Sequence, residues 1–112
     1  MTLTSSVSSQ ERSEQASSLT VQVVSSTLVR ISGTLDLSSR DLLTAVLSEM
    51  PASTIIVDVR ALQFVDPAGL AALTADHRRR RAVHGRLILA GCSPLLRCML
   101  RAGNYPMQSV PE

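Results

Sequence analysis

The chain has 112 residues and a mass of 12.0 kDa, the size of a single domain. Hydrophobic residues make up 45% and aromatic residues only 2%, so we expect a core of Leu, Val, Ile, Ala and Met. The net charge is only +2, no apolar run approaches the roughly 20 residues that span a bilayer, and the N-terminus lacks the pattern of a signal peptide. These features argue against membrane insertion and favour a cytoplasmic protein.

A low-complexity segment opens the chain. Residues 1–18 are rich in Ser, Thr, Gln and Glu and almost empty of large apolar side chains. Such a segment buries too little surface to offset the entropy lost on ordering. We therefore expect a flexible Ser-rich tail over 1–18 and one folded domain over 19–112.

The domain begins with a predicted β-hairpin followed by a helix. The hairpin strands are Leu19–Val24 and Leu28–Gly33, joined by a short Ser-Ser-Thr link. Ser38 or Ser39 would cap the helix, and Ser38 with the Asp three residues later resembles a capping box. Pro51 would end this helix, whose apolar face is formed by Leu42, Leu43, Val46, Leu47 and Met50.

A short β-branched run, Ile55–Val59, predicts a central parallel strand that is covered on both faces. Asp58 interrupts this run. Since a lone buried carboxylate is costly, we expect Asp58 either near the strand end or hydrogen-bonded to backbone N–H groups. Residues 61–65 would form the loop to the next element.

The longest predicted helix begins at Asp66 and Pro67. The Asp66 carboxylate can accept hydrogen bonds from the first free N–H groups, and proline suits the first turn because its missing N–H has no partner there. Leu70 and Leu73, with small Ala residues between them, would lie against the sheet. The helix would run to about Val83.

A strand and a helix complete the domain. The apolar strand Leu87–Ala90 follows the long helix, so strand, helix and strand form a βαβ unit with parallel strands. Ser93 would cap a last helix that begins at Pro94 and ends at Gly103. Tyr105–Pro111 would add a short edge strand.

The remaining residues of chemical interest favour structural roles, and we predict no metal or cofactor. Successive residues of a helix point in different directions, so for the basic run Arg78–Arg81 we favour a solvated helix end over the alternative of a patch for nucleic acid or an acidic partner. Cys92 and Cys98 lack the partners of a zinc site and are expected to pack. His77 and His84 are seven residues apart, too far for an i, i+4 metal pair, and are expected at the surface or its boundary.

The order of elements and four short sequences resemble the STAS domain family, in particular the bacterial anti-sigma factor antagonists. The resemblance covers about Leu19 to Met107 and implies an α/β fold. The fold would have a mixed central sheet of four to five strands, largely parallel with an antiparallel N-terminal hairpin, packed against three to four helices. The four sequences are Gly33-Thr34-Leu35-Asp36, the Ile55–Val59 strand with Asp58, Phe64-Val65-Asp66 followed by Gly69-Leu70, and Gly91-Cys92-Ser93-Pro94.

In that family, a Ser-Ser-Gly or Ser-Thr-Gly motif follows the equivalent of Asp66. Its first hydroxyl is phosphorylated by an anti-sigma factor that is an ATP-dependent serine kinase. The unmodified antagonist binds the kinase and the modified one releases it, since phosphate adds nearly two negative charges to the docking surface. Here Pro67 and Ala68 replace the hydroxyl residues, so the usual phosphoswitch cannot operate at this position.

The resemblance implies a non-enzymatic interaction module that binds an anti-sigma factor of the serine-kinase type, with ATP bound by that partner and no nucleic acid. Ser38 and Ser39 are alternative phosphorylation sites at the start of the first helix, and a homodimer is left open. The expected partner-binding residues are Asp36, Ser38, Ser39, Asp66, Pro67, Ala68, Gly69 and Leu70.

Other functions are also left open. The family includes subunits of larger assemblies, so a role in an ABC-type lipid-transport complex or a signalling scaffold is the main alternative. A nucleotide sensor would use the helix N-termini after Asp66 and Gly91, although the chain has no Gly-rich phosphate loop. For an enzyme there is no recognisable Ser–His pair, and Asp36 and Asp66 are expected to bond to backbone N–H groups rather than to perform acid–base catalysis.

Overall fold

The computed structural model describes residues 12–16 and 18–111. Within these residues, no helix has the length and apolar character to cross a membrane. The elements are β1 (Arg12–Ala16), β2 (Leu19–Val23), β3 (Leu28–Leu35), α1 (Arg40–Ser48), β4 (Thr54–Val65), α2 (Pro67–Arg81), β5 (Arg86–Ala90), α3 (Pro94–Ala102) and the short 3-10 helix η2 (Met107–Ser109).

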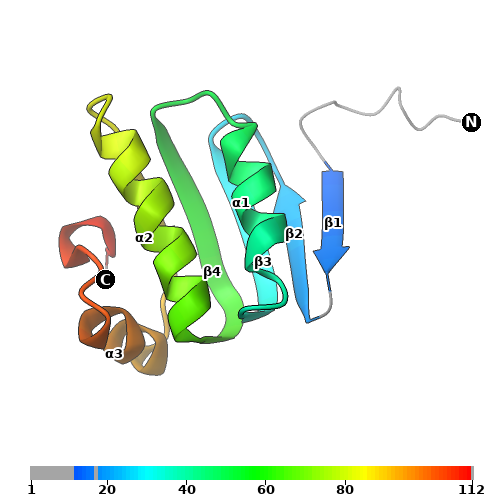
Figure 1. Ribbon diagram of the computed structural model, residues 1–112, viewed down its shortest axis with the longest axis vertical. Helices are drawn as coiled ribbons and strands as arrows, with labels where there is room; N and C mark the ends of the chain where they lie inside the picture. The colour runs from blue at the N-terminus through cyan, green and yellow to red at the C-terminus, as the bar shows by residue number, and fades with distance from the viewer. Residues whose placement is uncertain (1–11, 17, 112) are drawn as a thin grey trace, which may run out of the picture.

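The strands form one five-stranded sheet in the order β1-β2-β3-β4-β5. The pairs β1–β2 and β2–β3 are antiparallel, whereas β3–β4 and β4–β5 are parallel. Helices α1 and α2 lie side by side across one face of the sheet, and α3 lies at the end of the molecule where α2 begins (Figure 1). This arrangement confirms the predicted mixed α/β sheet with an antiparallel N-terminal hairpin.

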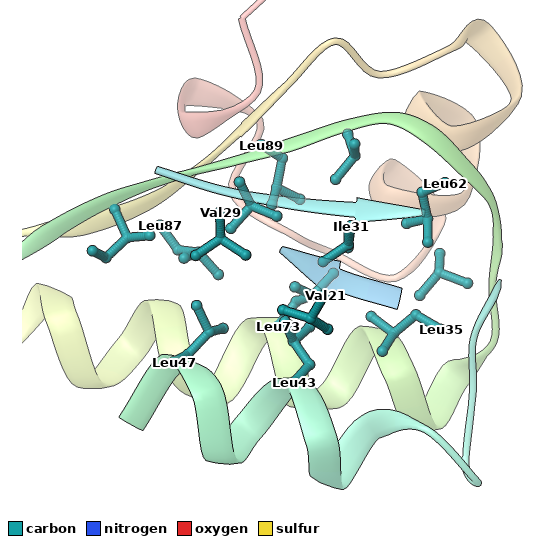
Figure 2. Close-up of a cluster of buried hydrophobic side chains, with 14 of the residues drawn as sticks. Val21, Val29, Ile31, Leu35, Leu43, Leu47, Leu62, Leu73, Leu87 and Leu89 are labelled. Atoms are coloured by element: carbon teal, nitrogen blue, oxygen red, sulfur yellow. The ribbon is translucent and has the colours of Figure 1, made fainter. Parts of the chain in front are cut away.

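The core is aliphatic and lies between the sheet and the α1–α2 layer (Figure 2). Val21 and Ile31 from the hairpin face Leu43 and Leu47 of α1 and Leu73 of α2, and each of these side chains is at most 1% exposed. Burying one side chain of this size contributes about 1.5–3 kcal/mol relative to leaving it in water. The alternation of apolar residues in the hairpin strands therefore decides which face of the sheet turns to the helices.

The predicted N-terminal tail is wrong for residues 12–16. They form β1, which pairs antiparallel with β2 along all five of its residues. The hydrogen-bonding groups at the free edge of β2 supply the partners for this strand, so it orders without needing many apolar side chains. Residues 1–11 and 17 of the predicted tail lie outside the described residues.

Two further predictions are corrected near the strand ends. Residues 61–65 belong to β4 and are not a loop, because β4 continues past register irregularities to pair with the whole length of β3. The segment Tyr105–Pro111 forms η2 instead of an edge strand. Pro106 has no N–H to donate to a strand ladder, and the hydroxyl of the buried Tyr105 donates to the Leu87 carbonyl at 2.7 Å, which fixes the segment beside β5.

The buried face of α2 is more polar than predicted. Leu70, expected to lie against the sheet, is only half-buried. His77, expected at the surface or its boundary, is 6% exposed, so a surface position is wrong. Arg80 is likewise buried, so the basic run is not a uniformly solvated helix end. The buried residues of α2 are Gly69, Leu73, Asp76, His77 and Arg80.

Arg80 joins α2 to the end of α1 and the loop that follows it. Its Nε donates to Asp76 at 2.6 Å, and its two terminal nitrogens donate to the carbonyls of Leu47 at 2.8 Å, Ala52 at 2.6 Å and Met50 at 3.3 Å. The carbonyls at a helix C-terminus have no partner within the helix. The Arg80 guanidinium therefore supplies donors that the end of α1 needs and neutralises Asp76 at the same time.

The two cysteines differ. Cys92 is partly buried and packs against the core, as predicted, whereas Cys98 is exposed on α3, so the packing role predicted for it is wrong.

Asp58 lies in the middle of β4 and is 7% exposed. It accepts a hydrogen bond from the Arg60 N–H at 3.0 Å, which confirms the expected backbone partner, and it forms ion pairs with Arg60 at 2.9 Å and Arg30 at 3.3 Å. The Arg60 side chain, more than any other group, lowers the pKa of Asp58 to about 2. A carboxylate inside this strand is therefore held ionised by two arginines rather than placed at its end.

We expect Asp58→Asn to lower the free energy of unfolding at pH 7 by roughly 1 kcal/mol, a value kept small because both arginines are well exposed to solvent. A lowered folded-state pKa adds stability above the unfolded value of about 3.9, and this gain disappears as the pH falls through the folded value. The difference between wild type and variant in urea unfolding should therefore shrink as the pH falls from about 4 toward 2 and disappear below about pH 2. Asp41→Asn, at a side chain that is 94% exposed and 3.8 Å from Arg40, is the matched control and should change stability by less than about 0.5 kcal/mol.

Candidate functional site

The candidate site lies where β3 and β4 end side by side. The strands are parallel and Leu35 pairs with Val65, so the residues that follow both strands emerge at the same edge of the sheet. The Asp66 N–H donates to the Leu35 carbonyl at 3.1 Å, and the Leu37 N–H donates to the Asp66 carboxylate at 3.2 Å. The other carboxylate oxygen accepts from the Gly69 N–H at 2.7 Å, which confirms Asp66 as the N-cap of α2. Asp66 thus fastens the loop after β3 to the first turn of α2.

The Asp36 carboxylate organises that loop. One of its oxygens accepts the N–H groups of Ser38 at 3.0 Å and Ser39 at 3.1 Å and the hydroxyl of Ser38 at 2.8 Å. The hydrogen bond from the Ser38 hydroxyl is the main reason that the pKa of Asp36 is lowered. The predicted capping box between Ser38 and Asp41 is wrong, because Asp36 takes these donors and the N-cap of α1, Ser39, makes no side-chain cap hydrogen bond.

The two serines of this loop differ in exposure. Ser39 is 0% exposed, and its hydroxyl lies 3.0 Å from the Asp36 nitrogen and 3.1 Å from the Thr34 carbonyl. Ser38 is exposed. Of the two alternative phosphorylation sites, only Ser38 therefore presents its oxygen to an incoming enzyme.

The first turn of α2 carries the altered motif. Pro67 occupies the first helical position and is exposed, and Ala68 is half-buried. Neither side chain has an oxygen. A Cβ on Gly69 would lie 2.6 Å from the Leu35 carbonyl oxygen, so only glycine lets α2 start this close to the end of β3. The backbone shape of the turn is thus set by Asp66, Pro67 and Gly69 without any hydroxyl group.

An apolar groove continues from this turn between α2 and α3, which lie close together at this end of the molecule (Figure 1). One hollow of about 370 Å³ is bordered by Phe64, Pro67, Leu70, Met99 and Gly103, among others. A second hollow of about 380 Å³ shares Pro67, Leu70 and Gly103 and extends along α2. Together the two hollows form the α2–α3 groove, which begins at the altered motif.

The structure brings together the two predicted groups, Asp36–Ser39 and Asp66–Leu70, through the hydrogen bond between Leu37 and Asp66. Sequence reasoning missed Phe64 and Met99 as site residues, because they reach the groove from elements separated along the chain. One signal for Phe64 was available: it is the only Phe in the chain and directly precedes the motif. It is 45% exposed, which is unusual for a large aromatic side chain.

A mixed five-stranded sheet with a helix N-terminus at the joined ends of two parallel strands is the arrangement of a STAS domain. A protein-family model described as "Mlab, STAS domain" matches residues 18–105. Because the match covers most of the chain, the protein belongs to this family.

Solved structures share the fold. The unphosphorylated form of the anti-sigma factor antagonist SpoIIAA has a TM-score of 0.64 at 24% identity, covering 83% of this chain and 85% of its own. The phosphorylated form of SpoIIAA from Bacillus has a TM-score of 0.63 at 25% identity, covering 83% of this chain and 88% of its own. A sulfate transporter family protein from Wolinella succinogenes has a TM-score of 0.66 at 21% identity, covering 75% of this chain and 74% of its own. The predicted resemblance to the antagonists is confirmed at the level of the fold.

Curated relatives match a shorter stretch. Sulfate anion transporter 1 of Mus musculus is 42% identical over 52 residues, which are 46% of this chain. The sulfate transporter of Homo sapiens is 38% identical over a stretch of the same length. This chain spans about 7% of the length of either transporter.

Proposed function

We propose that this protein is a non-enzymatic interaction module that binds an anti-sigma factor of the serine-kinase type and is not released by phosphorylation at the family position. The observation that carries the proposal is the first turn of α2. It keeps the Asp66 cap and the close approach of Gly69 to β3, while Pro67 and Ala68 offer no oxygen to modify. The docking shape is therefore retained and the covalent off-signal is absent.

The α2–α3 groove supports a protein partner. Phe64, at the rim of the groove, is 45% exposed. Leu37, whose N–H donates to the Asp66 carboxylate, is 63% exposed. Exposed apolar side chains beside a preformed groove are the usual composition of a docking surface. The partner would lay an apolar segment between α2 and α3 and contact the Asp36–Ser39 loop at the groove's end.

A second candidate function is a subunit of a larger assembly such as an ABC-type lipid-transport complex. The description of the matching family, "Mlab, STAS domain", favours it, and the likeness to transporter STAS domains is in keeping with it. The same groove would then bind the ATPase or permease of that assembly. The two candidates differ in the partner and not in the surface used.

We expect Phe64→Asp to weaken binding to the anti-sigma factor at least about tenfold, because it places a charge where apolar area is buried. The measurement is isothermal titration calorimetry with each purified kinase-type anti-sigma factor of the source organism. Val83→Asp is the matched control, since Val83 is also exposed, at 60%, but lies just beyond the other end of α2. It should bind as wild type does.

Failure of every such anti-sigma factor to bind the wild-type chain would contradict the first candidate. Loss of binding to an ABC ATPase in the Phe64→Asp variant alone would support the second. Equal loss in both variants would show that the groove is not the docking surface.

A further inference from the structure

A hollow of about 270 Å³ lies on the other half of α2, away from the α2–α3 groove. It is bordered by His77 and Arg81 of α2, Arg86 at the start of β5, and Pro106, Gln108 and Ser109 of the C-terminal segment. Figure 1 shows this segment turning back beside α2. We propose that this hollow binds a phosphate group, either as inorganic phosphate or as a phosphate monoester.

His77 carries a hydrogen-bond donor and borders this hollow. Its Nδ1 accepts the Leu87 N–H at 3.1 Å, so the proton of the neutral ring is on Nε2. Within residues 12–16 and 18–111, Nε2 has no hydrogen-bond partner, although the side chain is only 6% exposed and borders the hollow. A buried N–H group without a partner costs free energy that a bound acceptor would recover.

Ser109, Arg81 and Arg86 also bring hydrogen-bond donors to the hollow. Ser109 is 3% exposed, and its hydroxyl makes no hydrogen bond within the described part of the chain. Arg81 and Arg86 form no ion pair with any described residue. Among residues 12–16 and 18–111, no acidic side chain borders the hollow, and the carboxylate of Asp76 on α2 is bonded to Arg80.

The end of α2 does not oppose an anion strongly. The negative end of a helix dipole arises from carbonyls without partners. Here the carbonyl of Arg80 accepts the Gly85 N–H at 2.8 Å, and that of Arg81 accepts the His84 N–H at 3.1 Å. Burial is the main cause of the lowered pKa of His77; the charges of Arg81 and Arg86 lower it further, while the hydrogen bond with Leu87 and the charge of Asp76 act against them.

The donor set indicates the ligand class. Two guanidinium groups, an imidazole N–H and a hydroxyl match the several acceptor oxygens of a phosphate, and Arg binds such groups through paired hydrogen bonds. The hollow is larger than one tetrahedral ion, so it leaves space for an organic substituent. This site is separate from the docking surface proposed above, so either proposal can fail without the other.

The ring signals of His77 can serve as the NMR probe of binding, because the chain has only two histidines. Titration of the full-length protein with inorganic phosphate, at constant ionic strength and pH, should shift the ring signals of His77 in an NMR spectrum and raise its pKa. His84 is exposed and does not border the hollow, so its signals serve as the internal control. Parallel titrations with sulfate and AMP separate the bare anion from a monoester: tighter binding of AMP indicates that the substituent is also held.

Arg81→Gln and Arg86→Gln should each weaken phosphate binding by about tenfold, as expected for losing one charge-assisted contact. Arg101→Gln, at an exposed arginine on α3, should leave it unchanged. All three positions are exposed, so the variants are expected to fold. The proposal is overturned if His77 does not respond to millimolar phosphate, if His84 responds equally, or if Arg101→Gln weakens binding as much as the other two changes.

Discussion

Replacing Arg80 by Met is expected to destabilise the protein by about 3–5 kcal/mol, the cost of removing one partner of a buried ion pair. Arg80 is 6% exposed and Asp76 is 5% exposed. The methionine fills a similar volume but donates nothing. The Asp76 carboxylate keeps only its contact with the half-exposed Arg79. The Ala52 carbonyl loses its donor, and the Leu47 carbonyl keeps the Met50 N–H.

Urea unfolding followed by circular dichroism measures this change. Arg78→Ala is the matched control, because Arg78 belongs to the same basic run, is exposed, and has no side-chain hydrogen bond or ion pair within the described residues. It should change stability by less than about 0.5 kcal/mol. Equal effects of the two substitutions would contradict the structural role assigned to Arg80.

A double variant separates the cost of the unpaired Asp76 charge from the cost of altered packing. Asp76→Asn combined with Arg80→Met removes the stranded buried charge, so it should be less destabilised than Arg80→Met alone. If the double variant is as unstable as the single one, the unpaired carboxylate is not the cause of the loss.

The helices and strands could be predicted because the short sequence patterns that indicate them are consistent with how these elements pack. The apolar alternation of the hairpin strands, the β-branched run that includes Val57, and the Ser93-Pro94 and Asp66-Pro67 helix starts all predict the observed elements. Each of these signals lies within a few residues of sequence. They therefore indicate the correct elements without knowledge of distant partners. The prediction that the β-branched strand is covered on both faces is wrong, because Ile56 is 38% exposed.

The predictions that failed concern residues whose environment is set by distant parts of the chain. Arg80 is buried because carbonyls from the end of α1 and the following loop are presented to it, about thirty residues earlier in the sequence. His77 is buried because the Leu87 N–H and the Tyr105 ring meet it. The edge strand β1 forms by backbone pairing with β2, so its own sequence carries no apolar pattern that would indicate a strand.

Only the part of the candidate site that depends on local contacts was predicted from the sequence. A capped helix start is indicated by the spacing of Asp66, Pro67 and Gly69, because the contacts among these residues lie within one helical turn. The groove beside them combines Phe64 with Met99 of α3, a pairing that only the tertiary structure creates.

Pro67→Ser should restore the missing switch. Pro67 is exposed at the first position of α2, so a serine there would present its hydroxyl at the position that the resemblance to the antagonists implies for phosphorylation. With a kinase-type anti-sigma factor and ATP, we expect a phosphate on residue 67 and a loss of affinity of at least about tenfold, because the phosphate adds nearly two negative charges at the proposed docking surface beside Asp66. Mass spectrometry locates the phosphate, and calorimetry measures the affinity.

Ala71→Ser is the control for this variant, since it adds a hydroxyl to an exposed position one turn further along α2. It should remain unmodified and bind equally well with and without ATP. Phosphorylation of Ala71→Ser alone would contradict the assignment of the first turn as the modified position.

One comparison tests whether this protein is an antagonist with no covalent release: the dissociation constant of the wild-type chain for its anti-sigma factor, with and without ATP. The retained Asp66–Gly69 turn without a hydroxyl predicts two values that agree within about twofold. Release of the wild-type chain on addition of ATP, with phosphate found on any of its residues, would contradict the account.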